Sequence, residues 1–397
     1  MSPSQSSPTS QSALLTRIGE LAVDMGAVRR DLHRHPELAY NEQRTASVVA
    51  RLLREWGIEV HEGIGRTGLV GVITAGNSER AIGLRADMDA LPIHETSGAP
   101  HASANAGVAH SCGHDGHMAM LLCAARYLSE TRRFNGRVHL LFQPAEEGLA
   151  GARAMIEDGL FKRFPCAEVY ALHNWPILPA GTIATRAGPI MGASDRFTIT
   201  VRGTGGHAAQ PHLASDSVLC AAQIVTGAHT LIPRRIDPTA TAVLSITRIQ
   251  GGASFNVLPD QVQLFGTVRT FDPAVQDKLE ATLREWVELT AKAAGCTASL
   301  EYRRIYPATI NDPTCAQHAL DAASALFGRA LRADAPAATA EDFAFMLQQV
   351  PGAYIWVGSR KGDASPSLHH PSFDFNDEAL PAGAALLASL AERRLPV

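Results

Sequence analysis

The stretch His110-Ser-Cys-Gly-His-Asp-Gly-His117 leads directly into an apolar segment at residues 118–128. It holds three imidazoles, one thiol and one carboxylate, and each of these groups can bind a transition metal or orient a residue that does. Its two glycines allow the backbone to turn sharply. Because the segment that follows is rich in helix-forming residues, we expect a metal-binding loop that leads into a buried helix.

Short apolar strands and helices alternate on both sides of this loop. We predict strands at residues 68–74, 81–85, 137–142, 168–172 and 353–358, and helices at 13–34, 42–56, 149–160, 313–327 and from about 378. This alternation is typical of strands that are covered by helices on both faces. The predicted fold class is α/β, with a mostly parallel sheet flanked by helices.

The pattern changes between residues 189 and 306. Here the predicted elements are a strand at 194–202, a helix at 215–232, strands at 239–249 and 257–270, a helix at 273–294 and a strand at 297–306. This β-α-β-β-α-β order is that of a ferredoxin-like α+β unit. We therefore expect a disordered polar tail (1–12), a catalytic metal-binding domain made of 13–188 and 307–397, and an inserted domain at 189–306.

The composition argues against several classes of partner. The net charge is -4, which does not favour binding to nucleic acid or to an anionic membrane surface. We find no apolar run long enough to span a bilayer, and the polar N-terminus lacks the apolar core of a signal peptide. The six cysteines are scattered without CxxC pairs, which predicts reduced thiols and a cytoplasmic location.

Further candidate ligands follow the ends of predicted strands. They lie in Arg85-Ala-Asp-Met-Asp89, Gln143-Pro-Ala-Glu-Glu-Gly148 and His173-Asn-Trp-Pro176, while Leu368-His-His-Pro371 precedes the last helix. Sites in open α/β sheets form beyond the carboxyl ends of the strands. The adjacent Glu146 and Glu147 point in different directions, so that one can bind a metal while the other accepts a proton from an activated water.

Each candidate also has a simpler interpretation. An adjacent pair of acidic residues is commonly a solvated turn, and a lone cysteine such as Cys112 is commonly an inert buried thiol. His173, His369 and His370 could be hydrogen-bonded core histidines. The aspartates at 87 and 89 could orient ligands or cap helices. The other five cysteines are expected to serve packing alone.

Taken together, the motifs resemble those of the aminoacylase/hippurate hydrolase family, a branch of the two-metal carboxypeptidase-like amidohydrolases. The resemblance runs from about residue 27 to the C-terminus. It rests on nine motifs in the family's order: Asp31-Leu-His-Arg-His-Pro-Glu-Leu38, Arg85-Ala-Asp-Met-Asp-Ala-Leu-Pro92, Cys112-Gly-His-Asp-Gly-His117, Gln143-Pro-Ala-Glu-Glu-Gly148, His173-Asn-Trp-Pro176, Gly205-Gly-His-Ala-Ala-Gln-Pro211, Gly251-Gly-Ala-Ser-Phe-Asn-Val-Leu-Pro259, Glu341-Asp-Phe343 and Leu368-His-His-Pro371.

The resemblance implies two divalent metal ions and a general base, Glu146. A thiolate ligand favours zinc, although relatives accept manganese, cobalt or nickel. The choice of His369 over His370 rests on the family pattern alone. Ser111 stands where the family commonly has alanine. The implied metal ligands are Cys112, His114, Glu147, His173 and His369.

The inserted domain resembles the family's lid and dimerisation domain, which implies a homodimer or homotetramer. His207 matches a histidine that stabilises the oxyanion in a partner's site, although its glycine-rich segment could equally be a tight turn at the end of a strand. Asn256 and Asn174 are expected to bind substrate. Ligand-orienting roles are expected for Asp87, Asp89 and Asp115.

The function that follows is that of a metal-dependent amidohydrolase that cleaves the amide of an N-acyl amino acid, such as hippurate. The alternatives within the family are an N-acetyl-diaminopimelate deacetylase and an amino-acid-conjugate hydrolase. A non-catalytic metal-binding protein on the same scaffold is a third alternative, and it would be expected to lack the Glu146–Glu147 pair. A nicotinamide or flavin enzyme is disfavoured because no strand is followed by GxGxxG.

Overall fold

The computed structural model describes residues 8–363 and 365–397 and divides into two compact units. The large unit comprises the chain up to Ile190 together with Ile310–Ala335 and Asp342–Val397, and the small unit comprises Met191–Thr309 and Pro336–Glu341. The return of Pro336–Glu341 to the small unit differs from the predicted single segment 307–397. It follows from main-chain pairing, because the Gly192 N–H donates to the Ala337 carbonyl at 3.0 Å.

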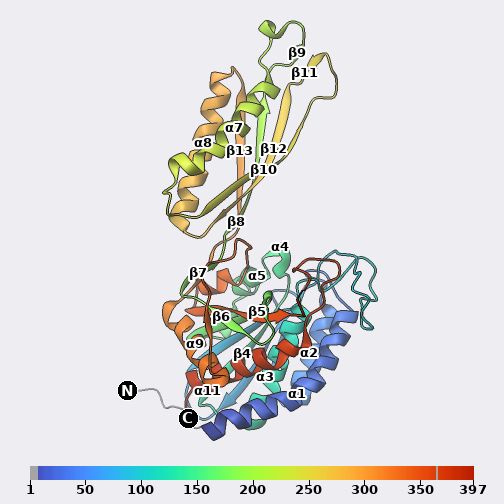
Figure 1. Cartoon of the computed structure of the whole chain (residues 1–397), viewed down its shortest axis with the longest axis vertical. Helices are drawn as coiled ribbons and strands as arrows, with labels where there is room; N and C mark the ends of the chain where they lie inside the picture. Colours follow the sequence, from blue (N-terminus) through green and yellow to red (C-terminus); the bar gives the residue numbers. More distant parts are fainter. Residues whose placement is uncertain (1–7, 364) are drawn as a thin grey trace. The chain divides into compact units, whose positions relative to one another are not determined.

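An eight-stranded sheet with the order β1-β2-β4-β3-β5-β16-β6-β15 forms the centre of the large unit (Figure 1). The central neighbours β4, β3, β5 and β16 are parallel, which confirms the predicted mostly parallel sheet. The edge strands β1 and β15 and the short inner strand β6 are not among those predicted, because they are short or carry exposed residues. The strands are β1 (Glu59–Ile64), β2 (Gly68–Ala75), β3 (Ala81–Asp87), β4 (Gly136–Gln143), β5 (Glu168–Pro179), β6 (Ile183–Thr185), β15 (Leu331–Arg332) and β16 (Gly352–Arg360).

Helices pack on this sheet and on one another. The helices α3 and α9 contact the sheet directly, while α1 and α11 pack against α3. Residues 8–12, predicted as part of a disordered tail, are helical at the start of α1, and the rest of that prediction lies outside the described residues. The helices are α1 (Pro8–Arg34), α2 (Gln43–Glu55), α3 (His114–Thr131), α4 (Glu146–Leu149), α5 (Gly151–Glu157), α6 (Leu160–Arg163), α9 (Pro313–Phe327), α10 (Ala344–Leu347) and α11 (Leu380–Arg394).

The small unit has an antiparallel sheet with the order β10-β12-β8-β13, on which α7 and α8 pack side by side (Figure 1). This arrangement confirms the predicted ferredoxin-like unit. The single strand predicted at 257–270 is instead two strands, because Pro259 lies between them. The elements are β8 (Ser194–Arg202), β9 (Gly206–His207), α7 (Ser217–Arg235), β10 (Ala242–Gly251), β11 (Val257–Leu258), β12 (Gln261–Thr270), α8 (Pro273–Ala293) and β13 (Thr297–Tyr306).

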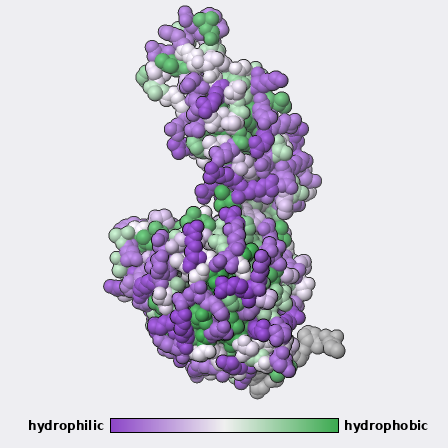
Figure 2. Space-filling model, turned by 180° about the vertical axis from the view of Figure 1, so that it is seen from behind, coloured by the Kyte–Doolittle hydropathy of each residue, from purple (hydrophilic) through white to green (hydrophobic). Residues whose placement is uncertain are grey.

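Two short strands, β7 (Gly188–Met191) and β14 (Thr309–Asn311), pair with each other where the chain passes between the units. The surface in Figure 2 is largely hydrophilic, and its hydrophobic residues form small separate groups. Among the described residues, no helix combines the length and the apolar character needed to cross a membrane.

Candidate metal centre

The loop before α3 can be built only with glycine at position 113. Gly113 has a φ of 89°, and a Cβ atom at this position would lie 2.5 Å from Nδ2 of Asn174. The left-handed turn ends the loop and starts α3 at His114. As a result, the side chains of Cys112 and His114 project from a rigid junction rather than from a mobile loop.

Two groups of three candidate ligands meet at this junction and share Cys112. In the first group are Cys112, His114 and His173, and in the second are Cys112, Glu147 and His369; within each group the ligand atoms lie within 4.8 Å of one another. The Cys112 Sγ is 3.5 Å from Nε2 of His173, and Oε1 of Glu147 is 3.1 Å from Nε2 of His369. The structure thus brings all five candidate ligands together.

The hydrogen bonds of these residues fit a bound metal. Nδ1 of His173 donates to the Asn174 carbonyl at 2.7 Å, which leaves the Nε2 lone pair directed at Cys112. Within residues 8–363 and 365–397, the buried His114 ring forms no well-aligned hydrogen bond and faces only the Asp89 and Asp87 carboxylates at 3.3 and 3.7 Å, while Oε1 of Glu147 faces the His369 ring without a well-aligned bond. Buried polar atoms are normally paired, so these atoms indicate a site built for a ligand.

The charges around the centre favour a cation. Burial alone would lower the pKa of His114, but the Asp87 and Asp89 carboxylates outweigh it and raise the pKa to about 10. Burial raises the pKa of the Cys112 thiol well above its usual range, and Glu147 and Glu146 add to that increase. A thiolate at this position therefore needs a metal ion beside it, which is how structural and catalytic cysteines become ligands.

The two glutamates lie on a strained turn after β4. Ala145 and Ala150 both have positive φ values, 52° and 56°, a conformation that persists only where the surroundings enforce it. The Asp89 carboxylate holds the turn, because it accepts the main-chain N–H of Glu146 at 3.0 Å and that of Glu147 at 2.9 Å. The buried Glu146 carboxylate consequently lies beside the ligand cluster, grouped with His114 and Glu147.

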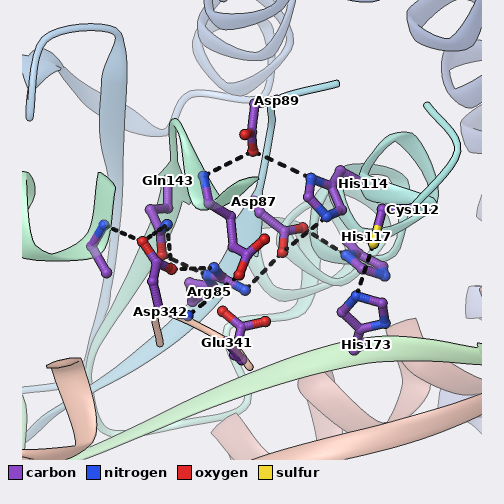
Figure 3. Close-up of polar contacts among 12 residues, drawn as sticks. Arg85, Asp87, Asp89, Cys112, His114, His117, Gln143, His173, Glu341 and Asp342 are labelled. Carbon is purple, nitrogen blue, oxygen red and sulfur yellow. Dashed lines mark hydrogen bonds and ion pairs between the residues drawn. The ribbon is translucent and has the colours of Figure 1, made fainter. Parts of the chain in front are cut away.

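The three aspartates expected to orient ligands lie in two different places. Asp89 Oδ1 is 3.3 Å from Nδ1 of His114, and Asp87 Oδ2 is 3.7 Å from its Nε2, so both face a candidate ligand (Figure 3). Asp115 points elsewhere and joins a buried ion cluster, where it lies 2.9 Å from Nδ1 of His33 and 3.2 Å from Nη1 of Arg29. Asp115 can therefore act on the centre only through the start of α3.

Asn174, which is expected to bind substrate, is bonded in this structure to the loop that carries Cys112. Its side chain is fully buried, and Nδ2 donates to the Cys112 carbonyl at 2.6 Å and lies 3.0 Å from Nε2 of His117. Its Oδ1 accepts from the Ser359 hydroxyl at 3.2 Å. Because these bonds use both ends of the amide, Asn174 fixes the Cys112 loop.

The two neighbouring histidines near the C-terminus have different surroundings. His369 has a φ of 65°, and its ring faces Glu147. Nδ1 of His370 accepts the Ser372 main-chain N–H at 3.1 Å and lies 2.7 Å from the Ser372 hydroxyl. The ring of His369 therefore faces the candidate ligands, whereas the ring of His370 is hydrogen-bonded to its own loop.

His207 and Asn256 lie together in the small unit, where β9 pairs with β11. The Ala208 N–H donates to the Asn256 carbonyl at 3.0 Å, and Val257 pairs with His207. Nδ1 of His207 accepts the Ala209 N–H at 3.1 Å, so the neutral ring carries its proton on Nε2. The exposed ring can therefore donate a hydrogen bond from Nε2.

Three residues of the centre are absent from the sequence-based assignment. His117 is buried, Asp87 lies 2.6 Å from its Nδ1, and its Nε2 accepts the Asn174 N–H at 3.0 Å; together with Asp87 and His114 it forms a further group of candidate ligands. Arg85 and Asp342 form a buried ion pair beside it. The available signal was an arginine in the mainly apolar strand β3, because a fully buried charge needs a partner.

Comparison with known proteins fits this geometry. Residues 83–393 match the peptidase family M20/M25/M40. The chain belongs to this family. A hippurate hydrolase of Campylobacter jejuni is 37% identical over 384 residues, which cover 96% of this chain and 99% of that protein. The predicted relationship to the aminoacylase/hippurate hydrolase family is confirmed.

Two further relatives of this M20-family enzyme come from Bacillus subtilis. An N-acetylcysteine deacetylase is 37% identical over 366 residues, covering 92% of this chain and 95% of that protein. The crystal structure of a dinuclear metal-binding peptidase of the M20 family is 34% identical with a TM-score of 0.84, covering 95% of this chain and 99% of that one. The protein is thus a metal-dependent M20 amidohydrolase/peptidase, which eliminates the non-catalytic alternative.

Proposed function

We propose that this enzyme hydrolyses the amide bond of N-acyl amino acids and releases a carboxylic acid and an amino acid. The observation that carries the proposal is the pair of ligand groups that share Cys112 beside the buried Glu146. The hippurate hydrolase and the N-acetylcysteine deacetylase among its relatives support this substrate class. A hippurate-like substrate is the preferred one.

We propose two divalent ions, with zinc preferred because the ligand set includes a thiolate. Manganese, cobalt or nickel would be accepted by the same nitrogen and oxygen ligands. Such ions polarise the scissile carbonyl and lower the pKa of an attacking water. The proposed ligands are Cys112, His114, Glu147, His173 and His369.

Glu146 is the proposed general base. Its carboxylate is buried, and its backbone is held by Asp89, so a proton acceptor is fixed close to the ligand cluster. In the reaction Glu146 takes the proton of the attacking water on a carboxylate oxygen and then delivers it to the leaving amine nitrogen. This transfer converts the amine into a good leaving group without the participation of bulk solvent.

The small unit supplies the proposed lid. His207 presents an Nε2–H donor that suits an oxyanion, and Asn256 lies beside it as a proposed substrate contact. We propose that the small unit also forms the interface of a homodimer or homotetramer, in which His207 acts on a partner's site. All six cysteines are free thiols, in keeping with the proposed cytoplasmic location.

A substrate panel tests the proposal. The metal-free protein is reconstituted with zinc or manganese and assayed with benzoylglycine, N-acetylcysteine and N-acetyl-diaminopimelate. We expect the highest kcat/KM with benzoylglycine and complete loss of activity with a chelator. A preference for N-acetyl-diaminopimelate would shift the assignment to a biosynthetic deacetylase. Failure to release an amino acid from any N-acyl substrate, or activity that is indifferent to the chelator, would contradict the proposal.

A further inference from the structure

Two sequence motifs remain unexplained by the ligand set, namely Arg85-Ala-Asp-Met-Asp89 and Glu341-Asp-Phe343. In the structure their charged side chains meet (Figure 3). The guanidinium of Arg85 is completely buried near the end of β3, and its contacts include hydrogen bonds from each of its three nitrogens. Nη1 donates to Asp87 Oδ2 at 2.8 Å, Nη2 to Asp342 Oδ1 at 3.2 Å and Nε to Gln143 Oε1 at 2.8 Å.

One branch of this network leads to the candidate ligands. Asp87 Oδ1 lies 2.6 Å from Nδ1 of His117, whose Nε2 accepts the Asn174 main-chain N–H at 3.0 Å. The side chain of Asn174 in turn donates to the carbonyl of Cys112. Arg85 is therefore connected through Asp87 and His117 to the loop that carries Cys112.

The other branch leads to the proposed base. The Asp342 carboxylate accepts from Arg85, from Nε2 of Gln143 at 2.8 Å and from the Ala152 N–H at 2.9 Å. With the side chain anchored in this way, the main-chain N–H of Asp342 donates to Oε1 of Glu146 at 3.3 Å. The position of the Glu146 carboxylate consequently depends on where the Arg85–Asp342 pair holds the backbone at 342.

We propose that Arg85 and Asp342 are positioning residues that set the Glu146 carboxylate relative to the metal ligands. A planar guanidinium provides several donors in a fixed fork, which a lysine ammonium cannot reproduce. The inference rests on the proposed function, because it assumes that Glu146 is the base. A displacement of about 1 Å at such a group can lower turnover by about 100-fold.

The branch through Asp342 and the branch through Asp87 predict different consequences for conservative substitutions. Asp342→Asn keeps the size of the side chain but removes the charge that holds Arg85, and we expect kcat to fall about 10- to 100-fold with KM within about twofold of wild type. Metal affinity, measured by competition with a chromophoric chelator, should remain unchanged in this variant. Asp87→Asn should instead weaken metal binding by about 10- to 100-fold, because it lies on the ligand branch.

Arg85→Lys tests whether geometry matters beyond charge. Lysine retains the positive charge but lacks the planar fork of N–H donors. We therefore expect this substitution to lower both kcat and metal affinity. If Arg85→Lys fails to fold, Asp342→Asn still tests the branch that leads to Glu146. A wild-type kcat in Arg85→Lys would show that a positive charge at residue 85 is sufficient for activity. That result would overturn the positioning role.

A matched control comes from another buried carboxylate of the large unit. Glu168, at the start of β5, accepts from Nη2 of Arg394 at 2.8 Å and from the Tyr170 hydroxyl at 2.6 Å. Glu168→Gln also removes the charge of a buried carboxylate that pairs with an arginine, so it should lower the unfolding midpoint while leaving kcat unchanged. A loss of kcat in the control equal to that in Asp342→Asn would mean that general destabilisation explains both.

A double-mutant cycle separates this inference from the proposed function. In a Glu146→Gln background, adding Asp342→Asn should cause no further loss of kcat, because the group it positions is already inactive. Additive losses would overturn the positioning role of Asp342. If Glu146→Gln itself turns over like wild type, the proposed function fails. If only Asp342→Asn and Arg85→Lys resemble wild type, the inference alone fails.

Discussion

The two units of this chain bury different kinds of side chain. In the large unit, β3 is buried at every position, and it carries Arg85 and Asp87 among its apolar residues. In the small unit, β12 alternates between buried and half-buried residues, as expected for a sheet with helices on one face. The small unit thus has a largely apolar core in which Asp195 is buried, whereas the large unit keeps several charged groups in its interior.

Buried charges normally cost stability, so their presence has to be explained by what they hold in place. In the large unit Asp89 holds the turn that carries the two glutamates, and Arg85 bonds both Asp87 and Asp342 beside the candidate metal ligands. In the small unit the buried Asp195 of β8 accepts hydrogen bonds from Gln276 on α8 and from Tyr302 on β13. Both partners belong to the framework of the small unit. The comparison indicates that the buried charges of the large unit hold the candidate metal centre, whereas the buried charge at Asp195 is bonded only within the framework of the small unit.

The largest effect is expected at Glu146. Glu146→Gln retains the size of the side chain but removes the proton acceptor, and we expect kcat to fall by about 10²- to 10⁴-fold or more. Bound metal, measured by mass spectrometry of the native protein, and the unfolding midpoint should match those of wild type. Wild-type turnover in this variant would show that the buried charges of the large unit serve structure rather than catalysis.

A substitution that creates a cavity in the core of the small unit should have the opposite outcome, a loss of stability without a loss of metal. Leu283 on α8 is fully buried in the core of the small unit, so Leu283→Ala should lower the free energy of unfolding by about 2–5 kcal/mol. Metal content of the large unit should not change. Urea unfolding monitored by circular dichroism measures the first quantity, and metal analysis the second. Loss of metal from Leu283→Ala would show that the two units are not independent.

The sequence predicts the fold of both units and the candidate ligands, but it does not predict the contacts of the buried polar side chains in the large unit. The motifs identified the candidate ligands because metal binding requires particular residue types, and strand periodicity gave the fold of both units. The contacts of Asn174 could not be predicted, since its full burial depends on how the ends of β5 and β16 come together. The role of Arg85 was missed for the same reason, because Asp342 is 257 residues away in the chain.

Asn174 gives a sharper test of this point. If it fixes the Cys112 loop, Asn174→Ala leaves the Cys112 carbonyl and the His117 ring without these hydrogen bonds, and the free energy of unfolding should fall by about 1–3 kcal/mol. Metal affinity should fall with it, whereas KM at saturating metal should stay near that of wild type. A raised KM with unchanged metal affinity would instead support the expected role of Asn174 in substrate binding.

The smallest expected effects concern the pH dependence of folding stability. They also compare the interiors of the two units most directly. Burial alone would raise the pKa of Glu95 in the large unit, but hydrogen bonds from His33, Ser97 and Ser103 outweigh it and lower the pKa to about 2. The stabilisation from ionised Glu95 is therefore complete above its unfolded pKa, about 4.5, and is lost as the pH falls toward 2. Its partner His33 has a pKa raised to about 10, so it stays protonated throughout this range.

Asp195 in the small unit should behave in the opposite way. Its burial raises the pKa, so the folded state binds a proton more readily than the unfolded chain, and acidification stabilises the fold. We expect wild type to lose stability relative to Glu95→Gln, and to gain stability relative to Asp195→Asn, when urea unfolding is compared at about pH 6 and about pH 3. If the stability of wild type relative to each variant changes in the same direction at both positions, the surroundings of the two buried carboxyls are equivalent. Opposite signs would establish that the large unit stabilises buried charge through paired groups, whereas the small unit only tolerates it.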